Sequence, residues 1–351
     1  MEAASIPAAA PLSLRVRSMV SSYGLIAVLL ALPVIFLIHD LVHDGNAVRT
    51  GQNLVAGLSN GAIWALVAIG YTLVYGIVEL INFAHGDVFM LGSFVSASFF
   101  GTIGLAEGQS AGVLFFGLLL TLVVAMLVCG SLNVLIERVA YRPLRSAPKL
   151  APLITAVGMS FILENVGLLW RGGSQVGIVD LINSQHDLVK IFGVTITNSD
   201  LLSVAVTIPL LILMTSFIGR SRLGKAMRAT AQDPEAARLM GINVDTTISL
   251  TFLIGGMLAG AAGLIYALYQ TTIWYFQGFT GGLVAFTAAV MGGIGNLRGA
   301  VLGGLIIGFI QQMSDNRIGS EWTPAIVFAY LILIMVFKPS GLLGEQTRDA
   351  G

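Results

Sequence analysis

Residues 60–95 read NGAIWALVAIGYTLVYGIVELINFAHGDVFMLGSFV, which is two apolar runs joined by the short polar segment NFAHGD. That segment contains Asn82, His85 and Asp87. An ionisable side chain in hydrocarbon costs several kcal/mol unless it faces protein or water. The segment is therefore either a turn at the membrane surface or a glycine-punctuated helix break that lines a path. The turn is favoured for His85 and Asp87, and both interpretations stay open for Asn82.

The composition of the whole chain indicates a membrane protein. Of its 351 residues, 56% are hydrophobic and 10% are charged, and the mean hydropathy is +0.88, whereas soluble domains are about a quarter charged. The 42 glycines suit closely packed membrane helices. The 18 basic and 18 acidic residues cancel, so the charge indicates no nucleic-acid or acidic partner. The single cysteine, Cys129, excludes an intramolecular disulfide.

Ten segments are long and apolar enough to suggest membrane helices, since a bilayer core needs about 20 residues per helix and about 17 for a short span. They are 23–42, 52–76, 86–104, 111–137, 151–170, 200–218, 248–270, 281–296, 299–314 and 324–338. Only NLRG separates the eighth and ninth segments, which are either two spans or a re-entrant pair. The sequence predicts an all-α, polytopic membrane helix bundle of about ten transmembrane or partly re-entrant helices. All of 1–351 is expected to form one membrane domain.

Basic residues predict the orientation, because positive segments stay in the cytoplasm. With the N-terminus inside, fourteen of the 18 fall on the cytoplasmic side. The four predicted outside are Arg49, Arg171, Lys190 and Arg317. We therefore expect a multi-pass protein of a cytoplasmic membrane with both termini cytoplasmic. The run 23–38 follows Arg15 and Arg17 as in a secretory signal, but no cleavage site follows it, so we interpret it as the first membrane helix.

Two hydrophilic segments lie between the spans. The first, 171–199, is extracytoplasmic in this orientation, and LVKIFGVTITN within it predicts a short hairpin around Gly193. It is either a loose connector or a platform for an external partner. The second, the cytoplasmic loop 219–247, begins GRSRLGKA, one residue short of a phosphate loop. Ala226 lacks the hydroxyl that such a loop supplies to its metal, so we predict no nucleotide site here.

The second half of that loop reads DPEAARLMG and predicts a helix of roughly two turns. Asp233 can cap its free N–H groups, and Pro234 suits the first helical position. Glu235 places a negative charge at the positive helix end, and Gly241 ends the helix. From spacing alone, a solvated loop helix without a partner is as plausible as a docking element.

EAARLMG resembles the cytoplasmic coupling segment of bacterial ABC-importer permeases, in which Glu-Ala-Ala is followed by three residues and Gly. In that family the short helix docks into a groove on the ATPase subunit. The resemblance gives coupling roles to Asp233, Pro234, Glu235, Ala236, Ala237, Arg238 and Gly241. The broader family motif continues with Ile-x-Leu-Pro, whereas this chain has TFLI from Thr251.

A more specific resemblance covers most of the chain. Residues 60–95 are similar to the signature of the high-affinity branched-chain amino acid permease family, and three further segments agree with it. These are IERVAYRPLRS from Ile136, AFTAAVMGGIGNLRGAVLGGLIIG from Ala285, and KPSGLLG from Lys338. The similarity runs from about Gln52 to Gly344 and is closer to the first of the system's two permease subunits. The helix predicted at 23–42 has no counterpart in the familiar form.

The resemblance implies a permease subunit of an ABC importer for branched-chain or other hydrophobic amino acids. It implies four kinds of partner: a second related permease, two ATPase subunits that carry ATP and Mg, an extracytoplasmic binding protein, and membrane lipid. No cofactor is expected in this chain. Permeases for urea, amides or small carboxylates are similar, so they remain alternatives, as does a secondary transporter driven by an ion gradient.

Two interrupted segments predict a pseudo-repeat around a central path. The candidate path residues are Asn82, His85 and Gly86 in the first segment, and Gly293, Gly295 and Asn296 in the second. Gly299, Gly303, Gly304 and Gly308 follow at spacings that pack helices closely. HDLVH at 39–43 resembles a zinc-protease pattern without a third ligand, so we predict neither a metal site nor a catalytic residue.

Overall fold

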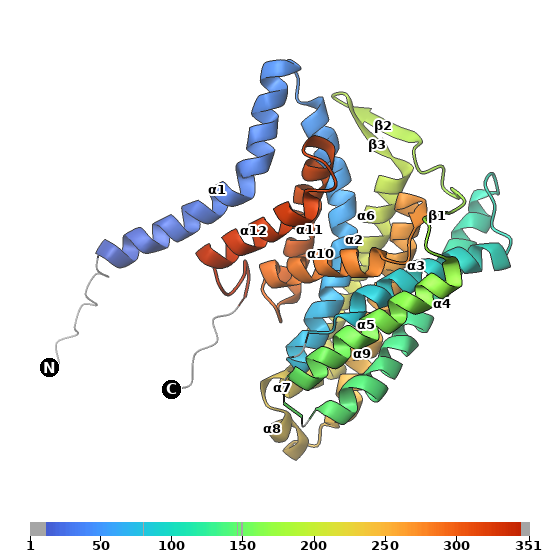
Figure 1. Ribbon diagram of the computed structural model, residues 1–351, viewed down its shortest axis with the longest axis vertical. Helices are drawn as coiled ribbons and strands as arrows, with labels where there is room; N and C mark the ends of the chain where they lie inside the picture. The colour runs from blue at the N-terminus through green and yellow to red at the C-terminus, as the bar shows by residue number, and fades with distance from the viewer. Residues whose placement is uncertain (1–11, 80, 146, 149, 345–351) are drawn as a thin grey trace.

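The computed structural model describes residues 12–79, 81–145, 147–148 and 150–344 (Figure 1). Both chain termini and Lys149, which we predict to be cytoplasmic, lie outside these ranges. In chain order, the helices are α1 (Leu12–His43), α2 (Val48–Val78), α3 (Ala84–Thr102), α4 (Ala111–Ile136), α5 (Leu150–Arg171), α6 (Asn198–Arg220), α7 (Arg222–Gln232), α8 (Pro234–Leu239), α9 (Val244–Gln270), α10 (Gln277–Gly292), α11 (Leu297–Arg317) and α12 (Thr323–Phe337). A π-helical turn (Glu137–Tyr141) and a 3-10 turn (Arg142–Leu144) continue α4.

Each of the ten predicted spans overlaps one helix, and α7 and α8 lie within the loop 219–247 that we predict to be cytoplasmic. Among the described residues, six helices are long and apolar enough to cross a membrane: α2, α4 with its continuation, α5, α6, α9 and α11. Shorter apolar helices occur at 27–43 and in α12. The polytopic membrane helix bundle is confirmed. The segment 281–314 forms two separate helices, α10 and α11, joined by a tight turn.

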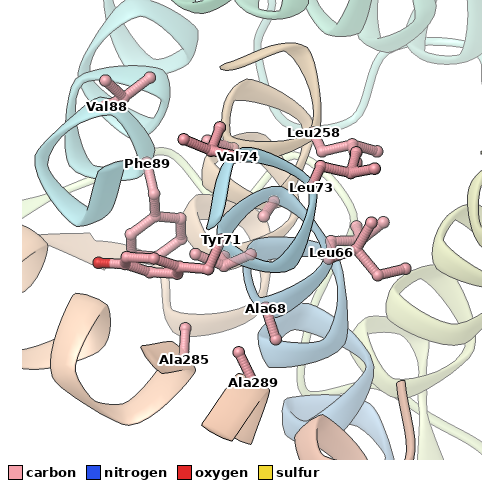
Figure 2. Close-up of a cluster of buried hydrophobic side chains, with 14 of the residues drawn as sticks. Leu66, Ala68, Tyr71, Leu73, Val74, Val88, Phe89, Leu258, Ala285 and Ala289 are labelled. Carbon is pink, nitrogen blue, oxygen red and sulfur yellow. The ribbon is translucent and has the colours of Figure 1, made fainter. Parts of the chain in front are cut away.

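The bundle has an interior pair of helices and an outer group. In their apolar windows, α2 is 78% buried and α9 is 72% buried, whereas α4, α5 and α6 are 22%, 28% and 17% buried. Two of the outer helices, α4 and α6, are also the most apolar, as expected where their side chains face lipid. Apolar side chains of α2, α3, α9 and α10 meet in one buried cluster (Figure 2). The polar segment NFAHGD, which leads into α3, therefore lies against this buried cluster.

Small residues let α2 and α11 touch through their backbones. A Cβ added at Gly308 would collide with the backbone of Gly61, and one added at Gly304 would collide with Ala65. On the other face of α11, Gly303 abuts Ala288 of α10 in the same way. The predicted role of these glycines in close packing is confirmed.

The two halves of the bundle repeat one arrangement. α9 packs antiparallel on α4, with Gly260 against Ala125, just as α2 packs on α11. α2 ends at Glu79 and α9 ends at Thr271, and both residues are left-handed with φ of 53° and 51°. After these ends, α3 and α10 begin close together, with Gly86 against Gly278.

A pseudo-repeat is thus present, but its pairing differs from our expectation. The counterpart of the segment at 82–87 is the break between α9 and α10, and not the turn at 293–296. Sequence alone missed this break because Thr271 and its neighbours form a continuous polar and aromatic stretch that reads as an ordinary loop.

The predicted hairpin around Gly193 is confirmed. β2 (Asp187–Ile191) and β3 (Val194–Thr197) pair antiparallel across Phe192 and Gly193, whose φ angles of 50° and 86° fit a two-residue hairpin turn. The Gln52 side chain of α2 holds β3 through two hydrogen bonds with the Thr195 backbone, each 2.9 Å. A second, smaller pair joins β1 (Val176–Gly177) to β4 (Thr272–Ile273). Figure 1 shows the hairpin and α8 at opposite ends of the bundle.

The first helix, α1, is bent and is attached to the bundle near its C-terminal end. Pro33 lies inside it, and beside the bend the Tyr330 hydroxyl of α12 accepts a hydrogen bond from the Leu32 N–H (3.3 Å). Near the end of α1, the buried carboxylate of Asp40 pairs with Arg317 of α11. Asp40 also accepts hydrogen bonds from the hydroxyl and N–H of Thr50, at 2.6 and 2.9 Å.

The contact between α2 and α11 can be tested with Gly308→Ala. The new methyl group would meet the Gly61 backbone, which cannot move aside as a flexible side chain would. Overpacking of this kind costs about 1–3 kcal/mol, so we expect a lower melting temperature in detergent. Gly158→Ala in α5 is the matched control, because nothing lies within 4 Å of its added Cβ. Equal melting temperatures for the two variants would contradict the proposed contact.

Candidate functional site

α8 has the predicted start. Oδ1 of Asp233 accepts hydrogen bonds from the N–H groups of Glu235 and Ala236, both at 2.9 Å. Pro234 occupies the first helical position, where its missing N–H removes no hydrogen bond. The helix therefore begins at a side-chain cap that the sequence encodes.

α8 also has the predicted end. The N–H of Gly241 bonds to the Arg238 carbonyl and the N–H of Ile242 bonds to the Ala237 carbonyl, each at 3.0 Å. With a φ of +82° at Gly241, these bonds form the glycine-terminated helix end known as the Schellman motif. Both ends of this short helix are fixed by local hydrogen bonds.

Most of α8 faces outward. Ala237 is its only buried residue, whereas Leu239 and Met240 are 88% and 82% exposed. Glu235, Ala236 and Arg238 are exposed as well. Two large apolar side chains on a two-turn helix form a small unpartnered surface, which is typical of a contact site for another protein.

The start of α9, separated from the end of α8 by four residues, is joined to the end of α4 by polar contacts. Asn243 caps α9 by accepting a hydrogen bond from the Thr246 N–H at 3.0 Å. Two residues further, Asp245 pairs with Arg145 at 2.5 Å and with Arg142 at 3.1 Å. Arg145 also pairs with Glu137, whose side chain is fully buried.

A buried hydrogen-bond chain continues from the π-helical turn to the break after α2. The Tyr141 hydroxyl donates to Oδ1 of Asn82 at 2.9 Å. The amide of Asn82 donates to Asn133 at 3.4 Å, and the Asn133 amide donates to the Phe252 carbonyl of α9 at 2.6 Å. Asn82 is thereby joined to both α4 and α9.

A small cavity adjoins Asn82 and brings the two predicted path segments together. It is lined by Tyr71, Tyr75, Ile81, Asn82, Phe286, Ala289 and Ile294. Its volume is about 10 Å³, enough for about one water molecule. An amino acid cannot occupy this cavity in the conformation seen here.

His85 and Asp87 differ from the favoured prediction. They do not lie in a surface turn but in the first turn of α3, where both are fully buried. Asp87 accepts a hydrogen bond from Ser160 of α5 at 2.5 Å, and the His85 ring packs on Tyr71 with centroids 4.8 Å apart. Gly86, between them, lets α3 approach α10. The helix break lies just before these residues, between the end of α2 at Val78 and the start of α3 at Ala84. The sequence did not show where the first helix ends.

Gly293, Gly295 and Asn296 form the turn between α10 and α11. The two glycines have φ of 107° and 89°. Asn296 caps α11 by accepting from the N–H groups of Arg298 and Gly299, at 3.0 and 3.1 Å. The segment KPSGLLG folds onto this turn, where Leu343 accepts a hydrogen bond from the Asn296 amide at 2.7 Å. These contacts give the three residues a structural role at the edge of the small cavity.

Sequence reasoning missed the residues that link these parts. They are Asn133, Glu137, Tyr141, Arg145, Asp245 and Ser249, whose hydroxyl donates to Glu137 at 2.7 Å. Two signals were present: an asparagine inside the apolar span 111–137, and a glutamate and arginine eight residues apart in IERVAYRPLRS. Neither identifies its partner on a helix more than a hundred residues away.

A polytopic helix bundle that carries an exposed, doubly capped helix at one end and paired helix breaks at its centre defines a membrane transport component. The comparisons with known proteins make this specific. The family model for the branched-chain amino acid transport system permease component matches residues 53–336. The chain belongs to that family.

Individual relatives agree. The chain is 40% identical over 296 residues to the high-affinity branched-chain amino acid transport system permease protein BraD of Pseudomonas aeruginosa, covering 84% of this chain and 95% of the relative. LivH of Escherichia coli K12 gives the same figures. The probable branched-chain amino acid transport permease protein LivH of Methanocaldococcus jannaschii is 27% identical, and the match covers 81% of this chain and 89% of that protein. α1 lies outside the family match.

The buried ion pair can be tested with Arg145→Gln. This change leaves the fully buried Glu137 without its cation, which typically costs about 3–5 kcal/mol. We expect a large drop in melting temperature of the purified protein. Arg142→Gln is the control, because its pair with Asp245 is about half exposed and such pairs contribute about 0–1 kcal/mol. A larger drop in melting temperature for Arg142→Gln than for Arg145→Gln would contradict the assignment of the buried ion pair to Arg145.

The cap of α8 can be tested with Asp233→Ala. The N–H groups of Glu235 and Ala236 would lose their acceptor, at a cost of about 1 kcal/mol. We expect hydrogen exchange of the α8 amides to become faster by about fivefold. Gln232→Ala, a change at an exposed neighbour, should leave this exchange unchanged. Identical exchange in both variants would show that the cap does not stabilise α8.

Proposed function

We propose that the chain is the transmembrane permease subunit of an ABC importer that moves branched-chain or other hydrophobic amino acids into the cell. ATP is hydrolysed on separate subunits. The observation that carries this proposal is α8: a rigid, capped helix that exposes Leu239 and Met240 at one end of a membrane bundle. The names of the relatives support the substrate class.

In this proposal α8 is the coupling helix, formed by Asp233, Pro234, Glu235, Ala236, Ala237 and Arg238 and ended by Gly241. It lies in the cytoplasm and inserts into a groove of an ATPase subunit. Gly241 and Asn243 join it to α9 within a few residues. A rigid connection is required, because a flexible one would absorb the displacement instead of passing it to α9.

The displacement then has a defined route to the centre of the bundle. α9 is bonded to the end of α4 through Asp245 and Arg145, and Tyr141 and Asn133 join that end to Asn82. A shift of α9 therefore changes the surroundings of the break after α2. By this route, the break after α2 is the part of the membrane domain that responds to the ATPase subunits.

Asn82, His85 and Gly86, with Gly293, Gly295 and Asn296, are proposed to lie along the inner part of the path. The small cavity lined by Asn82 and by Ile294, which lies between the two glycines, corresponds to a closed state. The remaining path is formed with a second related permease, so that two bundles enclose the substrate and two ATPase subunits lie beneath them. The whole chain acts as one membrane domain with both termini cytoplasmic, and the segment 171–199 faces an extracytoplasmic binding protein.

The coupling role can be tested by uptake of radiolabelled leucine into vesicles that contain the assembled importer. Leu239→Glu places a charge on the proposed docking surface, and loss of a buried leucine corresponds to about 1.5–3 kcal/mol. We expect uptake to fall by about tenfold or more. Gln232→Glu is the control, because it adds the same charge to the same loop outside α8.

Glu235→Lys and Gly241→Leu should also separate ATP hydrolysis from uptake. The first reverses the charge at the positive end of α8, and the second places a side chain at a φ of +82°. Uptake that persists without any ATPase subunit would contradict the proposal and favour a transporter driven by an ion gradient. Preference for urea or short carboxylates over leucine would change the substrate class only.

A further inference from the structure

A cavity of about 460 Å³ opens between the end of α4 and the start of α9, away from the small cavity beside Asn82. It is lined by Ser131, Val134, Arg138, Arg142, Asn243, Asp245, Thr246, Ser249, Leu250 and Leu253. One end of this lining is charged, with Arg138, Arg142 and Asp245, and the other end is mostly apolar, with Val134, Leu250 and Leu253 beside the hydroxyl of Ser131. The cavity therefore suits a molecule with the same division.

The charged end has an excess positive charge. Two carboxylates, Glu137 and Asp245, are paired with Arg145 and Arg142. Arg138 also lines the cavity, and within the described part of the chain its guanidinium has no hydrogen-bond or ion-pair partner. An unpaired guanidinium presents donors in a fork that matches a phosphate. The start of α9, 27 residues long, adds the positive end of a helix dipole.

The π-helical turn places Arg138 at this position. Residues 137–141 are wound more loosely than the α-helix that precedes them, and such turns redirect side chains and recur at functional sites. Glu137 faces inward and is buried, while Arg138 is exposed towards the cavity. The same turn that orients Tyr141 towards Asn82 thus leaves one cation at the surface.

The apolar end of the cavity is continuous with the lipid-facing surface. Val134, Leu250 and Leu253 form its apolar wall. On the neighbouring face of α4, Leu135 and Val139 are 57% and 64% exposed, as expected for side chains in contact with acyl chains. This order of charged and apolar side chains is the one expected where a bilayer changes from hydrocarbon to headgroups.

We propose that this cavity is a binding site for one anionic phospholipid of the surrounding membrane. The phosphate of the lipid is bound by Arg138, the hydroxyl of Thr246 lies at the same end of the cavity, and an acyl chain packs along Leu250 and Leu253. The inference depends on the multi-pass membrane fold and does not depend on the proposed transport reaction. Because Asp245 lines the same cavity and joins α9 to Arg145, the bound lipid would contact the route from α8 to the break.

Native mass spectrometry of the purified full-length chain, titrated with phosphatidylglycerol or phosphatidylcholine, tests the proposal. We expect one phosphatidylglycerol to bind more tightly than phosphatidylcholine. Arg138→Gln removes a charge-assisted hydrogen bond and should weaken that binding by about tenfold. Thr246→Trp fills the cavity without changing its charge and should weaken it too. Arg222→Gln, which removes one exposed charge from α7, should retain wild-type affinity.

Several results would overturn the lipid site. Wild-type affinity in both Arg138→Gln and Thr246→Trp would exclude the cavity, and an equal loss in Arg222→Gln would indicate a diffuse charge effect. Displacement of the lipid by glycerol 3-phosphate at equal concentration would mean that the site takes soluble phosphates. Unchanged lipid binding with loss of ATPase assembly in Arg138→Gln would assign the cavity to a protein contact. Retained melting temperature in each variant shows that folding is intact.

Discussion

Backbone contact between small residues is the interaction on which the rest of this structure depends. In lipid, apolar side chains gain little by leaving one hydrocarbon surface for another, so helices associate by close packing. Gly61 and Gly308 bring α2 against α11, and Gly260 and Ala125 bring α9 against α4. These two contacts fix the interior pair of helices, and the paired breaks follow from where α2 and α9 then end.

Polar groups at the two breaks are hydrogen-bonded by other parts of the protein. A membrane interior offers no water to an unpaired N–H or C=O. At the first break, Tyr141 and Asn133 hydrogen-bond the side-chain amide of Asn82, and after α9 the short β1–β4 pair takes up backbone groups. Polar side chains in this chain are therefore concentrated where helices stop. The same concentration gives α8 a hydrogen-bonded route to the centre.

Local patterns in the sequence predicted local structure well. The spans, the two ends of α8 and the hairpin at Gly193 each depend on neighbouring residues, and each was predicted. Burial of His85 and Asp87 depends on Ser160 and Tyr71, which lie on other helices, so a turn and a helix start look alike in sequence. The bridge by Arg145 needs Asp245, a hundred residues later, and pairing over that distance leaves no local pattern.

The added helix α1 has a consequence for how this permease could change in evolution. It lies outside the region matched by the family, yet its Asp40 is the carboxylate partner of Arg317, whose side chain is only 4% exposed. Removal of α1 would take away both this carboxylate and the Phe36 ring that lies against the Arg317 guanidinium, so the arginine would lose its ion pair and part of its cover. The extra helix is thus tied to the family fold by a charge pair, so a change at Asp40 or Arg317 is expected to require a matching change at the other residue.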